Sequence, residues 1–398
     1  MGSPETVIYM DNHATTRLDP RVVEAMLPYF TEIYGNAAST THVHGWEAKE
    51  AVEAARETIA AAIGATAREI YFTSGATESN NLAIRGVAER APPASQRVVS
   101  VRTEHPSVLD PIERLGQRGW ETILLPVVQA PDTRAGLVEL DQLAAALRAK
   151  TTLVSVMLAN NEIGAIQPLA EIARIGHEAG ALVHTDATQA VGKIPVDVNA
   201  LDVDLMSFTA HKLYGPKGVG ALYVRRRSPP IRIEPLLYGG GHERGLRSGT
   251  LNVPGIVGFA RAVELSVQQM ADESVRLRNL RDQLYRGLLA AVPRLTLNGP
   301  ALDPPAQRLP GNLNLCFHGV DGETLLLNLK DVVALSAGSA CSSANPEPSH
   351  VLRALGLSDE AARGSIRFGL GRFNTPEEVD RVVQSIAEAV DRLRTMGG

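Results

Sequence analysis

Short apolar runs alternate with helical patterns between about residues 69 and 225 of the chain. The runs are rich in valine, isoleucine and leucine, and they read EIYFTS, RVVSVRTEH, ETILLPV, TLVSVMLAN, ALVHTDA, VDLMSFTA and GALYVRR. Stretches with helical spacing, such as ESNNLAIRGVAERA and LAEIARIGHEAG, lie between them. Strands that alternate with helices predict parallel strands joined by crossovers, and continuous apolar runs predict a sheet covered on both faces. Ligands of such sheets bind beyond the carboxyl ends of the strands.

The pattern changes after residue 262. A long amphipathic helix is expected over about 263–291, and short strand-like runs such as NLNLCF follow it before a last helix. We therefore predict a large α/β domain over 18–262, and a smaller α+β domain made of 1–17 together with 263–398.

The length, the net charge and the apolar runs of the chain argue against several classes of protein. A chain of 398 residues exceeds one ordinary core and fits two domains, or one large domain with a smaller companion. A net charge of −5 argues against a general nucleic-acid-binding protein, which relies on basic patches. No apolar run is long enough to span a bilayer, and the start of the chain lacks the layout of a secretion signal. We expect a soluble cytoplasmic protein with no membrane partner and no direct nucleic-acid partner.

The two cysteines of the chain differ in their surroundings. A secreted fold of this size would seldom rely on one bridge, so a reducing compartment is expected. Cys316 lies in the alternating, strand-like run GNLNLCFHG and is expected in the core. Cys341 lies in ALSAGSACSSANPEPSH, which is small, polar and poor in packing residues. The two cysteines are therefore expected to have different roles.

Chemically useful side chains follow two neighbouring strand-like runs. Asp186 ends the run ALVHTDA, with Gln189 three residues later. Thr209, His211 and Lys212 end the next run. If both strands end on the same side of the sheet, a carboxylate and an amine share one crevice. Any single aspartate or lysine is far more often a solvated or ion-paired surface residue, so neither residue identifies a site alone.

Two further stretches join this set. In FTSGATESNNLAI, a strand leads through Ser74 and Gly75 into a helix near Ala76 and Thr77. The N–H groups at such a helix start suit an anion such as phosphate, although ordinary helix capping uses the same residue types. His105 follows the run RVVSVRTE. A lone histidine there is more often structural than catalytic.

The four stretches together match the needs of pyridoxal 5'-phosphate (PLP). A lysine can form a Schiff base with the aldehyde, and an acid can keep the pyridine nitrogen protonated so that the ring acts as an electron sink. A histidine can lie over the ring, and a glutamine can bond the ring oxygen. No metal is expected, because His42 and His44 of THVHG have no evident third ligand.

A series of motifs carries a more specific resemblance. They read MDNHATT, YGNAAS, FTSGATESNNLAI, TEHPSVLD, LANNEIGAIQP, HTDATQAVGKIPVD, SFTAHKLYGPKGVGALYVRR, GGGHERGLRSGTLNVP, SAGSACSS, EPSHVLRALG and SIRFGLGRF. With these motifs in this order, the chain resembles the cysteine desulfurases of the NifS/IscS type. These belong to the class V aminotransferase family of fold-type I PLP enzymes. The resemblance covers the chain from about Tyr9 to the last helix.

The resemblance implies a role for each matching residue. The catalytic residues would be Lys212, which holds the cofactor, His105, which stacks on the ring, and Cys341, which accepts sulfur. Asp186 would pair with the pyridine nitrogen and Gln189 with the ring oxygen. The remaining contacts would be Ala76, Thr77, Thr209 and His211 to the phosphate, Asn161 to the cofactor or substrate, Arg367 to the substrate carboxylate, and Thr250 to the phosphate of the neighbouring subunit of a homodimer.

The activity implied by the resemblance is removal of sulfur from L-cysteine. The freed lysine would move the α-proton, and the Cys341 thiolate would attack the substrate sulfur to form a persulfide, leaving L-alanine. The sulfur would pass to an acceptor, such as an iron–sulfur scaffold protein or a tRNA-thiolating enzyme.

Three alternatives remain open at this point. An aminotransferase would use Lys212 and Asp186 but has no need of Cys341. A selenocysteine lyase could use the same site for the selenium analogue. A degenerate, non-catalytic relative is opposed by the presence of all the residues named above.

Overall fold

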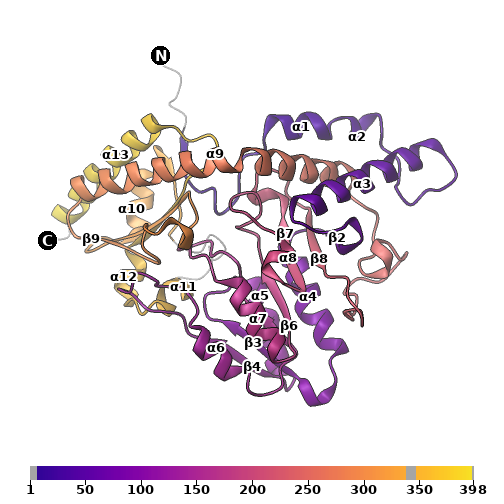
Figure 1. Ribbon diagram of the computed structural model, residues 1–398. Coiled ribbons are helices and arrows are strands. Elements are labelled where there is room, and N and C mark those ends of the chain that lie inside the picture. Colours follow the sequence, from indigo (N-terminus) through magenta and orange to yellow (C-terminus); the bar gives the residue numbers. More distant parts are fainter. Residues whose placement is uncertain (1–6, 338–346, 397–398) are drawn as a thin grey trace.

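The computed structural model describes residues 7–337 and 347–396. Figure 1 shows a large part built around a sheet and a smaller part beside it, with the long helix α9 (Val253–Ala291) running along both. None of the described helices is long and apolar enough to cross a membrane.

The large part is built on a seven-stranded sheet with the order β2-β8-β7-β6-β5-β3-β4. The strands are β2 (Ile70–Thr73), β3 (Arg97–Val101), β4 (Glu121–Leu125), β5 (Leu153–Ser155), β6 (Leu182–Asp186), β7 (Leu205–Thr209) and β8 (Gly220–Val224). The strands from β4 to β7 pair in parallel, whereas β8 is antiparallel to both β7 and β2. The mostly parallel central sheet is confirmed.

One strand departs from the parallel pattern that the sequence predicted. The run GALYVRR forms β8, and its direction is reversed because only residues 210–219 separate it from β7. A parallel connection needs a crossover of about a dozen residues or more, usually with a helix. The turn after Lys212 is too short for that and returns the chain as a hairpin.

Helices cover both faces of this sheet, as its continuous apolar strands predicted. On one face, α4 (Ala76–Arg90) and α5 (Pro106–Gln117) pack on strand residues such as Val98 and Leu205. On the other, α3 (Val43–Ala62), α7 (Leu169–Glu178) and the first half of α9 pack on residues such as Val99 and Phe208. The remaining described helices of this part are α1 (Pro20–Met26), α2 (Pro28–Thr31), α6 (Leu140–Ala146) and α8 (Val198–Leu201), with short 3₁₀ turns η1 (Ala67–Glu69), η2 (Pro93–Ser95), η3 (Ala210–Lys212) and η4 (Glu243–Gly245).

The smaller part has a separate apolar core. Its antiparallel sheet has the order β12-β10-β9, and β1 pairs in parallel with β11. The elements are β1 (Ile8–Tyr9), β9 (Leu295–Leu297), η5 (Pro305–Gln307), β10 (Asn312–Phe317), α10 (Gly322–Leu329), β11 (Val333–Ala334), α11 (His350–Ala354), α12 (Asp359–Arg363), β12 (Ser365–Gly369) and α13 (Pro376–Met396). Cys316 is 1% exposed within β10, which confirms its expected place in the core.

The helix expected over 263–291 starts ten residues earlier than predicted, at Val253. Pro254 lies in its first turn, where the missing N–H is tolerated. Glycine lowers the helical signal of this stretch, yet Gly258 is needed there, because a Cβ would come within 2.5 Å of Met26 Sδ on α1. The first half of α9 packs on the large core and the second half on the small one. The domain boundary predicted at residue 262 falls inside this helix and stays a prediction.

Candidate active site

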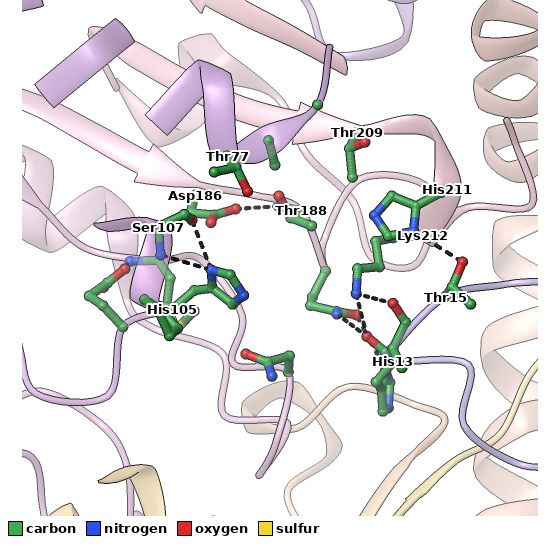
Figure 2. Close-up of a pocket in the computed structure, with 18 of the residues that line it drawn as sticks. His13, Thr15, Thr77, His105, Ser107, Asp186, Thr188, Thr209, His211 and Lys212 are labelled. Carbon is green, nitrogen blue, oxygen red and sulfur yellow. Dashed lines mark hydrogen bonds between the residues drawn. The ribbon is translucent and has the colours of Figure 1, made fainter. Parts of the chain in front are cut away.

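A cavity of about 450 Å³ opens where β6 and β7 end. The starts of α4 and α5, the loop after β5, residues 13–15 and β12 complete its lining. Figure 2 shows side chains from these separate segments gathered around one space. The predicted site residues that line the cavity are Ala76, Thr77, His105, Asn161, Asp186, Gln189, Thr209, His211, Lys212 and Arg367.

Two predicted site residues are not part of this lining. Thr250 is exposed in the segment before α9. Cys341 lies outside the described residues. The contact of Thr250 with a neighbouring subunit and the role of Cys341 therefore stay predictions.

Lys212 ends the short turn η3 directly after β7. Its Nζ donates a hydrogen bond to the backbone carbonyl of His13 at 2.7 Å, and another to the carbonyl of Ala14. Thr16 N also donates to the carbonyl of His211 at 2.9 Å, so the N-terminal segment is fixed against the turn. The amine is thus held at the wall of the cavity by groups that can only accept. Figure 2 shows these bonds from Lys212.

Asp186 is the last residue of β6 and is 4% exposed. Asn80 Nδ2 donates to one carboxylate oxygen at 2.8 Å, and Thr188 N donates to the other at 2.9 Å. A buried carboxylate needs such donors. Together they fix the carboxylate in one orientation at the cavity wall.

His105 caps the start of α5. Ser107 N donates to His105 Nδ1 at 3.1 Å, and Ser107 Oγ lies 2.8 Å from the same nitrogen. Because a backbone N–H can only donate, Nδ1 is the unprotonated nitrogen and the neutral ring carries its proton on Nε2. Burial lowers the pKa of His105, which favours this neutral form. Asn80 Nδ2 donates to Ser107 Oγ at 2.9 Å as well as to Asp186, so one amide links the imidazole and the carboxylate.

The helix start at α4 forms an open part of the wall. A Cβ at Gly75 would meet only Thr209 Oγ1, at 3.9 Å, so the space before the helix is unfilled. A Cβ at Gly220 would come within 2.7 Å of Gly75, which explains why β8 carries glycine beneath this turn. Thr209 Oγ1 donates to the carbonyl of Val219 at 2.9 Å, and must turn to donate elsewhere. Unsatisfied N–H groups at the start of a helix suit an anion.

His211 lies beside this part of the wall. Its Nδ1 is 3.1 Å from Thr15 Oγ1. Burial, with a further contribution from the charges of Lys212 and Lys217, lowers its pKa to about 4. The ring is therefore neutral near pH 7 and acts through hydrogen bonds.

Arg367, in β12, is 1% exposed and lies at the edge of the small part. Its Nη2 pairs with Asp11 Oδ1 at 2.8 Å, and Nη1 donates to the carbonyl of Asn161 at 3.4 Å. Its Nε has no hydrogen-bond partner within residues 7–337 and 347–396. Each Nη has a second N–H beyond these contacts, so the guanidinium keeps donors that suit a carboxylate ligand.

Sequence reasoning gave no role to several residues that line the cavity, among them His13, Glu104, Ser107 and His350. Glu104 is fully buried and accepts from Met157 N at 2.6 Å, and burial raises its carboxyl pKa well above the usual range. His350 Nε2 lies 2.9 Å from the carbonyl of Glu104. The motif TEHPSVLD contains Glu104 and Ser107 beside the assigned His105, and that adjacency was the available signal. His13 and His350 lie in the motifs MDNHATT and EPSHVLRALG, in which no residue was assigned a role.

Comparisons with known proteins agree on one family. The family model described as "Aminotransferase class-V" matches residues 8–382. The chain belongs to the class V aminotransferase family. A curated relative from Anaeromyxobacter dehalogenans (strain 2CP-C), named "Cysteine desulfurase IscS", is 55% identical over 389 residues, which are 98% of this chain and 94% of that protein. The family and the type of relative predicted from the motifs are confirmed.

Solved structures that are similar to this chain have the same fold. A "NIFS-LIKE PROTEIN" is similar with a TM-score of 0.89 at 39% identity, covering 97% of this chain and 100% of that chain. A structure described as "SspA in complex with cysteine" is similar with a TM-score of 0.78 at 32% identity, covering 93% of this chain and 100% of that chain. The predicted fold class is confirmed.

Class V aminotransferases are PLP-dependent enzymes, and the residues of this cavity fit that cofactor. The start of α4 lines the cavity, and its wall is open at Gly75, which suits an anion such as a phosphate. An amine on Lys212 and a carboxylate on Asp186 line the same cavity. The cavity volume also lies within the range of small-molecule sites.

Proposed function

We propose that this chain is a cysteine desulfurase that takes sulfur from L-cysteine and releases L-alanine. The single observation that carries the proposal is the cavity in which a lysine amine, a buried carboxylate, an imidazole and an arginine meet. Cysteine as substrate is supported by the 55% identical relative that is named a cysteine desulfurase. It is also supported by the similar solved structure of SspA, which is described as a complex with cysteine.

The cofactor proposed is PLP, which supplies an electron sink for the charge left when the substrate loses its α-proton. Lys212 would hold it, Asp186 would face the pyridine nitrogen, and Gln189 would face the ring oxygen. The phosphate would lie at the start of α4, within reach of Thr209 and His211. The other contacts proposed are Ala76, Thr77 and Asn161, with His105 over the ring.

Three residues of the cavity would each have a different role toward the substrate. Arg367 would bind the carboxylate of L-cysteine through the Nη hydrogens that its contacts with Asp11 and Asn161 leave unused, while Asp11 holds the guanidinium in place. Lys212 Nζ, oriented by the carbonyls of His13 and Ala14, would move the α-proton. His105, with its proton on Nε2, would donate a proton to the substrate.

The sulfur atom of L-cysteine would be transferred to Cys341. Its thiolate attacks the substrate sulfur, the carbon–sulfur bond of the substrate breaks, and the products are L-alanine and a persulfide on Cys341. This balances as L-cysteine plus a thiol giving L-alanine plus a persulfide. The acceptor that takes the sulfur, an iron–sulfur scaffold or a tRNA-thiolating enzyme, and a cytoplasmic location stay predictions.

A homodimer is part of the proposal. Large apolar side chains are exposed along α1–α3 and the connecting segment, namely Leu27, Phe30, Tyr34, Val43 and Trp46, each at least 51% exposed. Exposed apolar side chains that lie this close together in the chain favour an association surface. A second copy that covers them would let Thr250 reach the neighbouring cavity.

A paired assay tests the activity. Purified, PLP-loaded protein receives L-cysteine and a reductant, and alanine and sulfide are quantified in the wild type and in Cys341→Ala. We expect equal amounts of both products from the wild type and neither from the variant. Alanine from both proteins would contradict the role of Cys341, and no alanine from the wild type would contradict the activity.

A further inference from the structure

Gln189 lines the cavity, and its amide is fixed by three contacts with two residues, His13 and Lys193. Its side chain is 3% exposed. Nε2 donates to the carbonyl of His13 at 2.9 Å, and Oε1 accepts from Lys193 Nζ at 2.6 Å. His13 Nδ1 is 3.3 Å from the same oxygen.

The hydrogen-bonding partners determine the orientation of the Gln189 amide, that is, which neighbour Oε1 faces and which neighbour Nε2 faces. A backbone carbonyl can only accept, and a lysine ammonium can only donate, so Oε1 must face Lys193 and Nε2 must face His13. An amide nitrogen has two hydrogens, and the His13 carbonyl uses one of them. The second N–H is left for the cavity that Gln189 lines.

Lys193 itself is outside that cavity. It lines a separate, smaller cavity of about 30 Å³ together with His13 and Tyr214. Burial, and then the positive charges of Lys212 and Arg367, lower its pKa to about 7. A largely buried lysine whose charge is disfavoured in this way needs a hydrogen-bond partner, and the amide oxygen of Gln189 is the one found.

We propose that Lys193 is a positioning residue for the reaction: it holds the amide oxygen of Gln189 away from the cavity, so that an amide N–H faces the cofactor ring oxygen. This inference rests on the proposed function, because it needs PLP on Lys212. An N–H donor favours the anionic ring oxygen and makes it less basic. Without Lys193, Oε1 loses the donor that lies nearest to it, and only the two contacts with His13 hold the amide. The second N–H is then held less firmly toward the ring oxygen, which becomes more basic.

The readout is the visible absorption of the cofactor joined to Lys212, followed as a function of pH. In Lys193→Met, which keeps the length of the side chain and removes the donor, we expect the pH midpoint to rise by about half a unit or more. Lys193→Arg keeps a charged donor and should hold the midpoint near that of the wild type. Lys330→Met, at an exposed position far along the chain, should leave it unchanged.

A double variant tests whether Lys193 acts through Gln189 or whether its substitution disturbs the structure of the site in general. Gln189→Ala should raise the midpoint at least as far as Lys193→Met, and Gln189→Ala combined with Lys193→Met should raise it no further than Gln189→Ala alone. If Lys193→Met does not fold, Lys193→Gln replaces it with the same expectation, because the shorter side chain does not reach Gln189.

The outcomes distinguish this inference from the proposed function. A wild type that acquires no visible absorption with PLP contradicts the proposed function. A wild type that acquires it, with an unchanged midpoint in Lys193→Met or additive shifts in the double variant, overturns the positioning role alone.

Discussion

Two walls of the cavity are assembled in different ways. The strand-end wall consists of Asp186 and Thr209, the last residues of the adjacent strands β6 and β7, and of Lys212 in the turn after β7. The N-terminal wall consists of His13 and Arg367, which come from opposite ends of the chain. Arg367 pairs across 356 positions with Asp11, which does not itself line the cavity. The local pattern of apolar residues along the chain predicts the strand-end wall. The N-terminal wall, in contrast, forms only through contacts between residues that are far apart in the sequence. We therefore expect the strand-end wall to carry the chemistry and the N-terminal wall to orient the reacting groups.

The largest effect is expected at the strand-end wall. Lys212→Ala removes the amine that would hold the cofactor and move the α-proton, so alanine production should fall by a factor of about 10³ or more. Product quantification and the visible absorption of the PLP-treated protein measure this loss. Lys330→Ala, at an exposed lysine, is the control and should stay near wild type. Turnover by Lys212→Ala at more than a tenth of the wild-type rate would contradict the expectation that the strand-end wall carries the chemistry.

A smaller and different effect is expected at the N-terminal wall. Arg367→Lys keeps the charge opposite Asp11 but loses the two-pronged donor, so KM for L-cysteine should rise about tenfold or more while kcat falls less. Steady-state kinetics separate these constants. Arg174→Lys, in an exposed ion pair with Glu178, is the matched control. A fall in kcat with KM unchanged would show that Arg367 acts in the chemical step and that the walls share one role.

The smallest effect concerns acid stability next to the strand-end wall. Because the folded pKa of His211 is lowered to about 4, the unfolded chain binds a proton there between about pH 6.5 and pH 4 while the folded chain does not. The free energy of unfolding should therefore decrease as pH falls through this window. Denaturant titrations should show a shallower decrease in His211→Asn than in the wild type. Equal slopes would mean that His211 is protonated in the folded protein.

The difference between the two walls also explains what the sequence could predict. Asp186, Thr209 and Lys212 were found because apolar strands are visible as local runs and their ends meet at one edge of the sheet. The reversed direction of β8 followed from the shortness of its turn, which the apolar run does not reveal. The roles of these residues came from the motifs and stay predictions.

The N-terminal wall could not be predicted from the local pattern of residues in the sequence. His13 contributes its backbone carbonyl to Lys212 across 199 positions, and a carbonyl leaves no mark on composition. Lys193 contacts Gln189 at a spacing of four residues within a turn, and only the folded structure separates that contact from a solvated lysine. Cys316 was assigned to the core correctly, because its alternating run predicts a buried strand.

The measurement that tests the central claim most directly is the mass of the protein after a single exposure to L-cysteine without reductant. PLP-loaded protein is reacted, digested and analysed by mass spectrometry peptide by peptide. We expect the Cys341 peptide to gain the mass of one sulfur atom, with one alanine released per sulfur and the Cys316 peptide unchanged. Alanine release with no added mass at Cys341 would contradict the account.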